Sequence, residues 1–175
     1  MKRSVCIILS FLLILSLSAC TQQQTKLVDP VRFYYLRVQQ ADNIHHGTED
    51  SVLFPEEREA LGIRRDVTAL LKLYLAGPES ELYYSPIPAG TELVGWVAEE
   101  GVLTITLTEH FADLTGMDLT LACACMTRTF LGLTNADAVK IQIKNRTLDG
   151  KSFIIMTLDD LILLDEAGIT KGETP

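Results

Sequence analysis

Hydrophobic and polar residues alternate with two different periods along this chain, and each period predicts one kind of element. Apolar residues at every second position are typical of half-buried strands. This alternation is clear in Val102–Thr108 and Ala138–Lys144. The stretches Val31–Val38, Ser51–Phe54, Glu92–Ala98 and Ser152–Leu158 are rich in β-forming residues and are expected to be strands as well. In Val102–Thr108, leucine and isoleucine alternate with threonine, so one face of that strand is expected in the core. The stretches at 92–98 and 102–108 are joined through Gly101, which predicts a hairpin.

Two segments follow the helical period instead. In the first, apolar residues fall at i, i+3, i+4 and i+7, which places Val67, Leu70, Leu71 and Tyr74 on one buried face. Asp66 is expected to cap this helix, and Gly77-Pro78 to end it. The second helix is expected to start at Asp118 and to end near residues 133–135. Its apolar stripe is Leu119, Ala122, Cys123, Met126 and Phe130.

The resulting order β-β-α-β-β-α-β-β predicts an α+β fold made of a single small domain. We expect a mainly antiparallel sheet with both helices packed on one face. Pro55 is expected to stop the second strand, because proline cannot donate a ladder hydrogen bond. The charged segment Pro55–Glu59 that follows is expected to be exposed.

The first 19 residues have the pattern of a secretory signal peptide. Lys2 and Arg3 precede an apolar run from Val5 to Leu17, which is shorter than the roughly 20 residues that a membrane-spanning helix needs. The run ends in Leu17-Ser18-Ala19-Cys20, which resembles the lipobox of bacterial lipoproteins. That resemblance implies cleavage before Cys20 and attachment of a diacylglycerol, with acyl chains such as palmitate, to its thiol. Two or three acyl chains hold a protein durably on a membrane.

Charge then limits the partners of the mature chain. Removing residues 1–19 lowers Lys+Arg from 15 to 13 against 23 acidic residues, for a net charge of −10. Nucleic acids and anionic lipid surfaces are bound through clustered Lys and Arg, so neither is expected as a direct partner. About 145 residues follow the tether, which is enough for one domain with its own core.

Two cysteines remain once Cys6 leaves with the signal and Cys20 is the anchor. Cys123 and Cys125 are two positions apart on a predicted helix, where side chains point to nearly opposite sides. A disulfide between them is therefore geometrically poor, and no CxxC or nearby histidine completes a metal site. Both are expected to pack as small apolar residues.

An ordered series of motifs between Val67 and Gly150 resembles the GerMN domain, the sporulation and spore germination domain of Gram-positive bacteria. The series is Leu70–Pro78 (a helix ending in Gly-Pro), Ile87–Thr91 (Ile-Pro-x-Gly-Thr), Gly101–Phe111 (a strand followed by Thr-x-x-Phe), Thr127–Leu131 (in the second helix) and the strand Ala138–Lys144. These residues are structural, because turns and core positions such as Phe111 account for them. Some family members carry two copies of the domain, and this sequence carries one.

The resemblance implies a non-catalytic extracytoplasmic module without a cofactor. We therefore expect a lipid-anchored protein on the outer face of the cytoplasmic membrane that helps to assemble an envelope complex in sporulation or germination. Its expected partners are envelope or sporulation-complex proteins, with self-association as a further option. The predicted organisation is a signal peptide at 1–19, a lipidated tether at 20–30, the domain at 31–165 and a flexible tail at 166–175. A sheet edge or face would supply the binding surface.

Two other functions are alternatives: a small-ligand-binding lipoprotein for a germinant or cell-wall fragment, and a peptidoglycan-acting enzyme. Candidate chemistry is sparse. The groups considered are His45-His46 with Glu49 and Asp50 (metal), Thr108 with Glu109 and His110 (nucleophile and base), Glu56, Glu57 and Glu59 (glycosidase carboxylates), Asp159-Asp160 with Asp165-Glu166 (calcium), and Asn145-Arg146-Thr147 (glycosylation). None has the converging geometry or ligand spacing that its chemistry needs. Trp96 is expected to pack in the hairpin rather than to bind a sugar.

Overall fold

The computed structural model describes residues 29–38 and 52–161. The predicted lipidation site Cys20, the loop with His45 and His46, and the acidic pair Asp165-Glu166 lie outside the described residues. The elements are β1 (Pro30–Arg37), β2 (Phe54–Glu59), α2 (Val67–Leu75), β3 (Tyr83–Tyr84), β4 (Leu93–Glu99), β5 (Val102–Leu107), the 3₁₀ helix η2 (Glu109–Asp113), α3 (Gly116–Leu133), β6 (Ala138–Ile143) and β7 (Phe153–Thr157).

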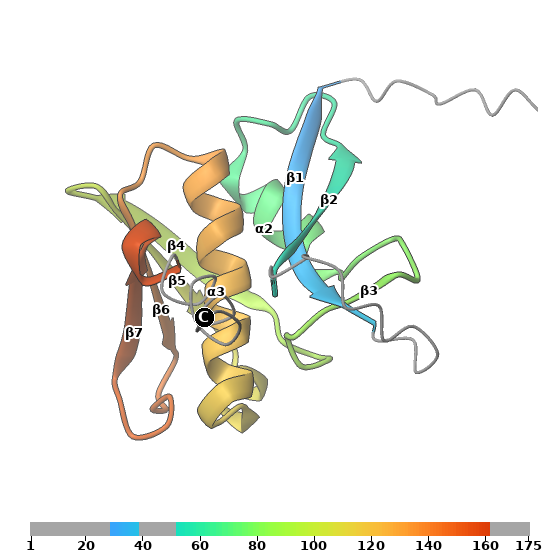
Figure 1. The fold of residues 1–175 in the computed structure, drawn as a ribbon. Coiled ribbons are helices and arrows are strands. Elements are labelled where there is room, and N and C mark those ends of the chain that lie inside the picture. Colours follow the sequence, from blue (N-terminus) through green and yellow to red (C-terminus); the bar gives the residue numbers. More distant parts are fainter. Residues whose placement is uncertain (1–28, 39–51, 162–175) are drawn as a thin grey trace, which may run out of the picture.

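The strands form two sheets rather than one. A three-stranded sheet has the order β2-β1-β3, and a four-stranded sheet has the order β4-β5-β6-β7 (Figure 1). Every pair is antiparallel except β5 and β6, which run parallel because α3 crosses over between them. The predicted α+β class with mainly antiparallel pairing is confirmed. The division into two sheets is new, since periodicity identifies strands without saying which of them pair.

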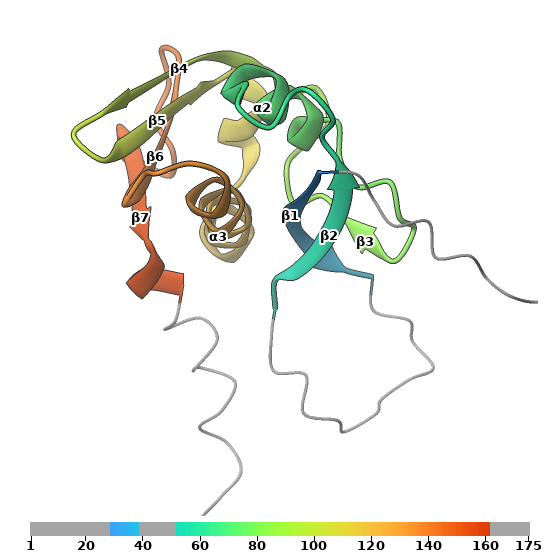
Figure 2. The ribbon, with the colours of Figure 1, turned by 90° about the horizontal axis from the view of Figure 1, so that it is seen from above.

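Helix α3 lies between the two sheets, as the view from above shows (Figure 2). It packs against β1 on one side and against β6 and β7 on the other. The predicted stripe is buried (Leu119, Ala122, Cys123, Met126 and Phe130), and so are Ala124, Cys125, Thr127 and Thr129. A helix buried nearly all round is expected where two layers enclose it.

Helix α2 has the boundaries that its sequence predicts. The Asp66 side chain accepts a hydrogen bond from the backbone N–H of Ala69 at 3.0 Å, so Asp66 is the N-cap. After the helix, Gly77 takes the left-handed conformation (φ 88°) that a helix stop requires. On the buried face, the Tyr74 ring stacks on Tyr35 with 5.1 Å between ring centroids and contacts Phe130 edge-on. This aromatic cluster joins α2, β1 and α3.

One edge of β1 is closed by helix side chains instead of a strand. Strand β3 pairs only with Leu36 and Arg37, so Tyr34 has no strand partner on that side. Its backbone N–H donates to the Thr129 hydroxyl on α3 at 2.9 Å, and its carbonyl accepts from the Tyr74 hydroxyl on α2 at 3.2 Å. These two bonds satisfy backbone groups that would be costly to bury unpaired. They fasten the three-stranded sheet to both helices.

Two predictions of element position are wrong. The second strand covers Phe54–Glu59, so it includes the charged segment that we expected to be exposed. Pro55 is tolerated because β2 is an edge strand, where one side of the backbone makes no ladder bonds. The second long helix begins at Gly116 with Thr115 as N-cap, and Asp118 lies in its first turn. An acidic residue is favourable there as well, since it complements the helix dipole.

Candidate interaction surface

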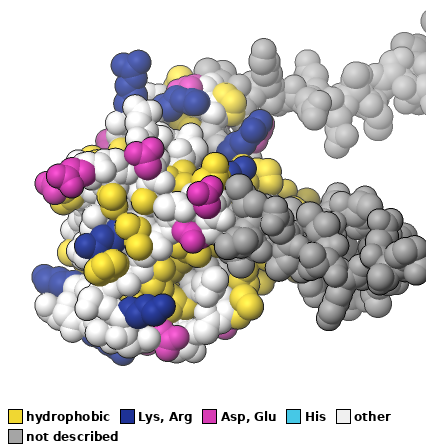
Figure 3. All heavy atoms as spheres, turned by 60° about the vertical axis from the view of Figure 1, so that its left-hand side comes forward, with side chains coloured by type: hydrophobic (Ala, Val, Ile, Leu, Met, Phe, Trp, Pro, Cys, Tyr) yellow, Lys and Arg dark blue, Asp and Glu magenta, His cyan; other side chains and the backbone are white. Residues whose placement is uncertain are grey.

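The four-stranded sheet has one face covered by α3 and one face that no described element covers. Cross-strand partners lie on the same face of a sheet. In β5, Leu103, Ile105 and Leu107 point to the buried face. The residues between them, and the cross-strand partners of those residues, therefore lie on the uncovered face. We call this side the outer sheet face; it consists of Val97, Thr104, Thr106, Lys140, Gln142, Phe153 and Ile155. The left-hand side of Figure 1 comes forward in Figure 3, and hydrophobic side chains gather there among scattered charged ones.

Three large apolar side chains on the outer sheet face are exposed. Val97 is 50% exposed, Ile155 48% and Phe153 43%, although all three lie in regular strands. The Lys140 ammonium lies 4.3 Å from the centroid of the Phe153 ring, and Gln142 donates to the Thr106 hydroxyl at 3.1 Å. Cation–π and cross-strand pairs of this kind hold the side chains in one orientation. The face is thus an ordered, mixed apolar and polar surface.

Strand β7 forms one edge of this sheet, and its own residues do not protect that edge. Its sequence, Phe-Ile-Ile-Met-Thr, contains no charge, proline or glycine. Its end is fixed by Asp160, whose carboxylate accepts from the Thr157 backbone N–H at 2.7 Å and from the Thr157 hydroxyl at 2.9 Å. These hydrogen bonds, the backbone one above all, lower the pKa of Asp160. An exposed, apolar edge strand is suited to pairing with another chain.

The opposite edge strand, β4, is less open. Its pairing with β5 is irregular between Leu93 and Gly95, which indicates a bulge. Trp96 turns toward α2, where its indole N–H donates to the Thr68 hydroxyl at 2.9 Å, and it stays 37% exposed. The side chain therefore connects the hairpin to α2, in line with a packing role.

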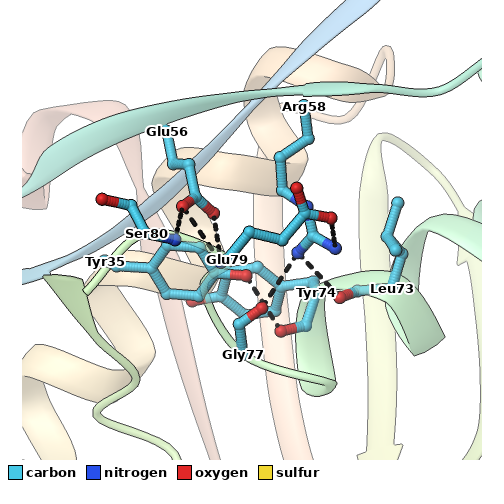
Figure 4. A network of polar contacts seen from close by, with 8 residues as sticks. All are labelled: Tyr35, Glu56, Arg58, Leu73, Tyr74, Gly77, Glu79 and Ser80. Carbon is cyan, nitrogen blue, oxygen red and sulfur yellow. Dashed lines mark hydrogen bonds and ion pairs between the residues drawn. The ribbon is translucent and has the colours of Figure 1, made fainter. Parts of the chain in front are cut away.

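A buried polar network occupies the inner face of β2 (Figure 4). The Glu56 carboxylate accepts backbone N–H bonds from Ser80 at 2.7 Å and from Glu79 at 3.0 Å. Arg58 donates to the carbonyl of Gly77 at 2.9 Å and makes an ion pair with Glu79 at 2.8 Å. Both residues of β2 are buried, with 7% and 6% exposure. The network holds the loop that follows α2, so its role is structural.

The position of Glu56 in this network also bears on the predicted glycosidase carboxylates, Glu56, Glu57 and Glu59. Along a strand, alternate side chains point to opposite faces. Glu56 is accordingly buried, whereas Glu57 and Glu59 are exposed on the other side, and Glu57 pairs with Arg32 at 3.1 Å. The three carboxylates do not converge on a common site, which a pair of glycosidase carboxylates must do.

The other candidate groups within the described residues are not assembled into a site either. The Thr108 hydroxyl accepts the backbone N–H of Glu92 at 2.9 Å, so it serves to join β4 and β5. His110 lies beside Gly90, about 3.5 Å from where a Cβ would be, and this glycine leaves room for the ring. Among residues 29–38 and 52–161, no three His, Cys, Asp or Glu side chains are placed to hold a metal ion.

Cys123 and Cys125 are free and buried, in line with the predicted packing role. Cys123 belongs to the main core, and Cys125 packs with Leu36, Leu53 and Leu161, so the two thiols face different parts of the interior. Burial raises the pKa of the Cys123 thiol to about 12 and raises that of Cys125 further above its usual range. Such thiols are unreactive at neutral pH.

Comparison with known proteins identifies the family, over a range that ends before β7. The family model described as Sporulation and spore germination, the Germane domain, matches residues 32–149. The chain belongs to this family. The match begins in β1, so the Germane domain also includes the three-stranded sheet, ahead of the motifs that start at Val67 in the sequence.

Two solved structures show some similarity to this chain. The tandem GerMN domains of the sporulation protein GerM from Bacillus subtilis share 14% identity (TM-score 0.49), and a candidate lipoprotein from Clostridium perfringens shares 16% (TM-score 0.44). Each alignment covers 75% of this chain; it covers 48% of the GerM chain and 88% of the other. This chain thus spans about half of the tandem GerM structure. No curated protein sequence matches it significantly.

The sequence contains signals for part of this surface. The threonines of β5 mark the side of the sheet away from the core, and the four consecutive apolar residues that begin β7 indicate a strand with two apolar faces. The position of β7 at the sheet edge could not be predicted from the sequence, since it depends on which strands pair.

In the described part of the chain, no helix has both the length and the apolar character to cross a membrane.

Proposed function

We propose that this Germane-domain protein is a non-catalytic, lipid-anchored interaction module on the outer face of the cytoplasmic membrane. It would help to assemble an envelope complex during sporulation or spore germination. The family match over residues 32–149 supports the setting. The lipobox-like sequence ending at Cys20 supports the anchor.

The observation that carries the interaction role is the outer sheet face together with the β7 edge. Both are ordered, and both expose apolar groups that an isolated domain gains nothing by exposing. An incoming strand could pair with β7 while its side chains pack beside Ile155 and Phe153. The candidate catalytic groups in the described residues are engaged in structural contacts or do not converge on one site, which favours binding over catalysis.

Site-specific photo-crosslinking tests this role in sporulating cells. A photoreactive amino acid at Ile155 is expected to crosslink to one envelope protein in the full-length, anchored chain. The same probe at Leu61 is the matched control, because Leu61 is also apolar and is 72% exposed but lies away from the outer sheet face. Crosslinking from neither position, or equally from both, would argue against this surface.

The anchor and the setting are tested separately. Replacing Cys20 with serine is expected to move the protein from the membrane fraction to the soluble fraction. A fluorescent fusion followed through sporulation is expected to concentrate at the septum and the engulfing membranes. Uniform signal on vegetative membranes, unchanged on starvation, would move the function to general envelope assembly.

A further inference from the structure

A second concave surface, unrelated to the outer sheet face, lies between β1 and the C-terminal part of α3. It is a groove of about 570 Å³. Three arginines line it (Arg32, Arg64 and Arg128), together with one carboxylate, Glu57, with Tyr34 and with apolar side chains that include Leu131 and Leu158. We call it the arginine groove. Three guanidinium groups around one groove are unexpected in a chain whose net charge is −8.

Arg128 is the arginine that α3 contributes to the arginine groove. It is the one exposed residue in the stretch 122–130 of α3, so the helix opens to solvent only at this position within that stretch. Its guanidinium lies over the Tyr34 ring, 5.4 Å from the centroid. That contact holds the guanidinium beside the ring and uses none of its N–H groups. In the described part of the chain, no hydrogen bond or ion pair engages these donors.

The other two arginines are partly engaged. Arg32 uses Nε to bind Glu57 at 3.1 Å, and Arg64 uses Nη1 to bind Asp29 at 3.1 Å and the Pro30 carbonyl at 2.8 Å. Within the described residues, the remaining N–H groups of both side chains have no acceptor in the chain. Three guanidiniums therefore share two carboxylates, and an additional anion would balance the charge.

Gly132 gives independent support for an occupant. It lies one helical turn after Arg128, and glycine is a poor helix former compared with alanine. A Cβ at Gly132 would have no atom of the described chain within 4 Å, so packing does not require glycine there. Glycine permits a close approach of another backbone, which fits a ligand lying along the groove.

We propose that the arginine groove binds an acidic peptide segment of a partner protein. A carboxylate of the segment would accept two N–H bonds from the Arg128 guanidinium, the geometry for which arginine is best suited. A neighbouring apolar side chain of the segment would pack against Leu131 and Leu158. A membrane surface is less suitable, because the groove is concave and the net charge of −8 is repelled by anionic lipids.

The test is calorimetric titration of the full chain, in a non-ionic detergent, with a synthetic blocked peptide of sequence Leu-Asp-Glu-Leu-Asp-Glu. We expect saturable binding that weakens as salt is raised, and no binding of the peptide with Asn and Gln in place of its acids. Arg128→Gln should raise Kd about tenfold, equivalent to about 1.4 kcal/mol. The matched control is Arg146→Gln, which removes a half-exposed arginine outside the groove and should leave Kd unchanged.

Two further variants separate binding from folding. Arg128→Lys keeps the charge but loses the fork, and should also weaken binding. Gly132→Ala should raise the unfolding temperature while it weakens binding, a combination that a purely structural role would not produce. Equal binding of the acidic and amide peptides, or an unchanged Kd in Arg128→Gln, would overturn the proposal. Binding of phosphatidylglycerol vesicles or inorganic phosphate through Arg128, without peptide binding, would overturn it as well. Neither result would affect the proposed role of the outer sheet face.

Discussion

Strands β2 and β7 occupy the same kind of position, the outer edge of a sheet, with opposite compositions. β2 contains a proline and four charged residues in six positions, whereas β7 contains neither in its five. In β2, Glu56 and Arg58 point inward and cap the loop after α2. In β7, Phe153 and Ile155 point outward and remain exposed.

The contrast teaches that the charges of β2 have two effects. They stabilise the interior, and together with Pro55 they make the edge unsuitable for pairing with another strand. β7 carries neither a charge nor a proline, and within residues 29–38 and 52–161 no strand pairs with its outer edge. The one apolar, unprotected edge of the four-stranded sheet is thus adjacent to the exposed apolar side chains of the outer sheet face.

The largest effect should come from breaking the β2 network with Arg58→Ala. This change leaves the carbonyls of Leu73 and Gly77 without their donor, and it also removes the ion pair with Glu79. We expect a loss of about 2–4 kcal/mol in the free energy of unfolding, measured with urea.

The control is Glu57→Gln on the same strand, where the carboxylate is exposed and its ion pair with Arg32 is solvated. Its cost should be within about 0.5 kcal/mol. Similar effects of the two substitutions would mean that the Arg58 contacts contribute no more than a surface pair.

Alkaline pH should lower the free energy of unfolding, because ionisable groups are buried in the core between β2 and β7. Burial raises the pKa of the Cys123 thiol to about 12, and it raises the pKa values of the Tyr35 and Tyr74 hydroxyls as well. Groups with a raised pKa in the folded state give stability that is fully present below the unfolded pKa and lost as pH rises. Thermal unfolding should therefore be insensitive to these groups up to about pH 9 and fall steadily above it.

Thiol labelling is a second test of whether the core around α3 is closed to solvent. Neither Cys123 nor Cys125 should react with a thiol reagent at neutral pH in the folded chain, and both should react after unfolding. Rapid labelling of the native chain at these positions would show that α3 is not enclosed.

The periodic elements could be predicted from the sequence, and the network could not. Helix α2, its cap Asp66 and the buried face of β5 follow directly from apolar spacing. β2 was missed because its buried positions are Glu56 and Arg58, and hydropathy alone places such residues outside. Only the tertiary structure supplies the backbone groups of residues 73–80 that satisfy them. The arginine groove could not be predicted for a similar reason, since its arginines come from distant parts of the sequence and only the fold brings them together.

A smaller effect on stability is expected from Ile155→Lys, which gives β7 the kind of charge that β2 carries. Ile155 lies on the outer sheet face and is 48% exposed, so the free energy of unfolding should change by at most about 0.5 kcal/mol. If the proposed role is right, crosslinking from Val97 on the same face should nevertheless disappear. A variant that unfolds, or one that still crosslinks fully, would show that β7 is not a tolerant binding edge.

The smallest effect should come from Asp160→Asn at the end of β7. The hydrogen bonds from Thr157 lower the pKa of this exposed carboxyl group. A lowered pKa gives stability that is present above the unfolded pKa and lost as pH falls through the folded one. The substitution should therefore slightly reduce the difference in melting temperature between neutral and acidic pH. A larger difference in the variant would contradict the assigned hydrogen bonds.

The arrangement of β1 has a mechanical consequence. Residues 1–28 join the domain directly at β1, so a pull transmitted through them acts along that strand. β1 is held by six paired positions in β2 on one side and by the side chains of Thr129 and Tyr74 on the other. A force along the strand loads these bonds together in shear instead of opening them one by one. The strand nearest to the proposed anchor is therefore placed to resist tension between a membrane and whatever the rest of the domain holds.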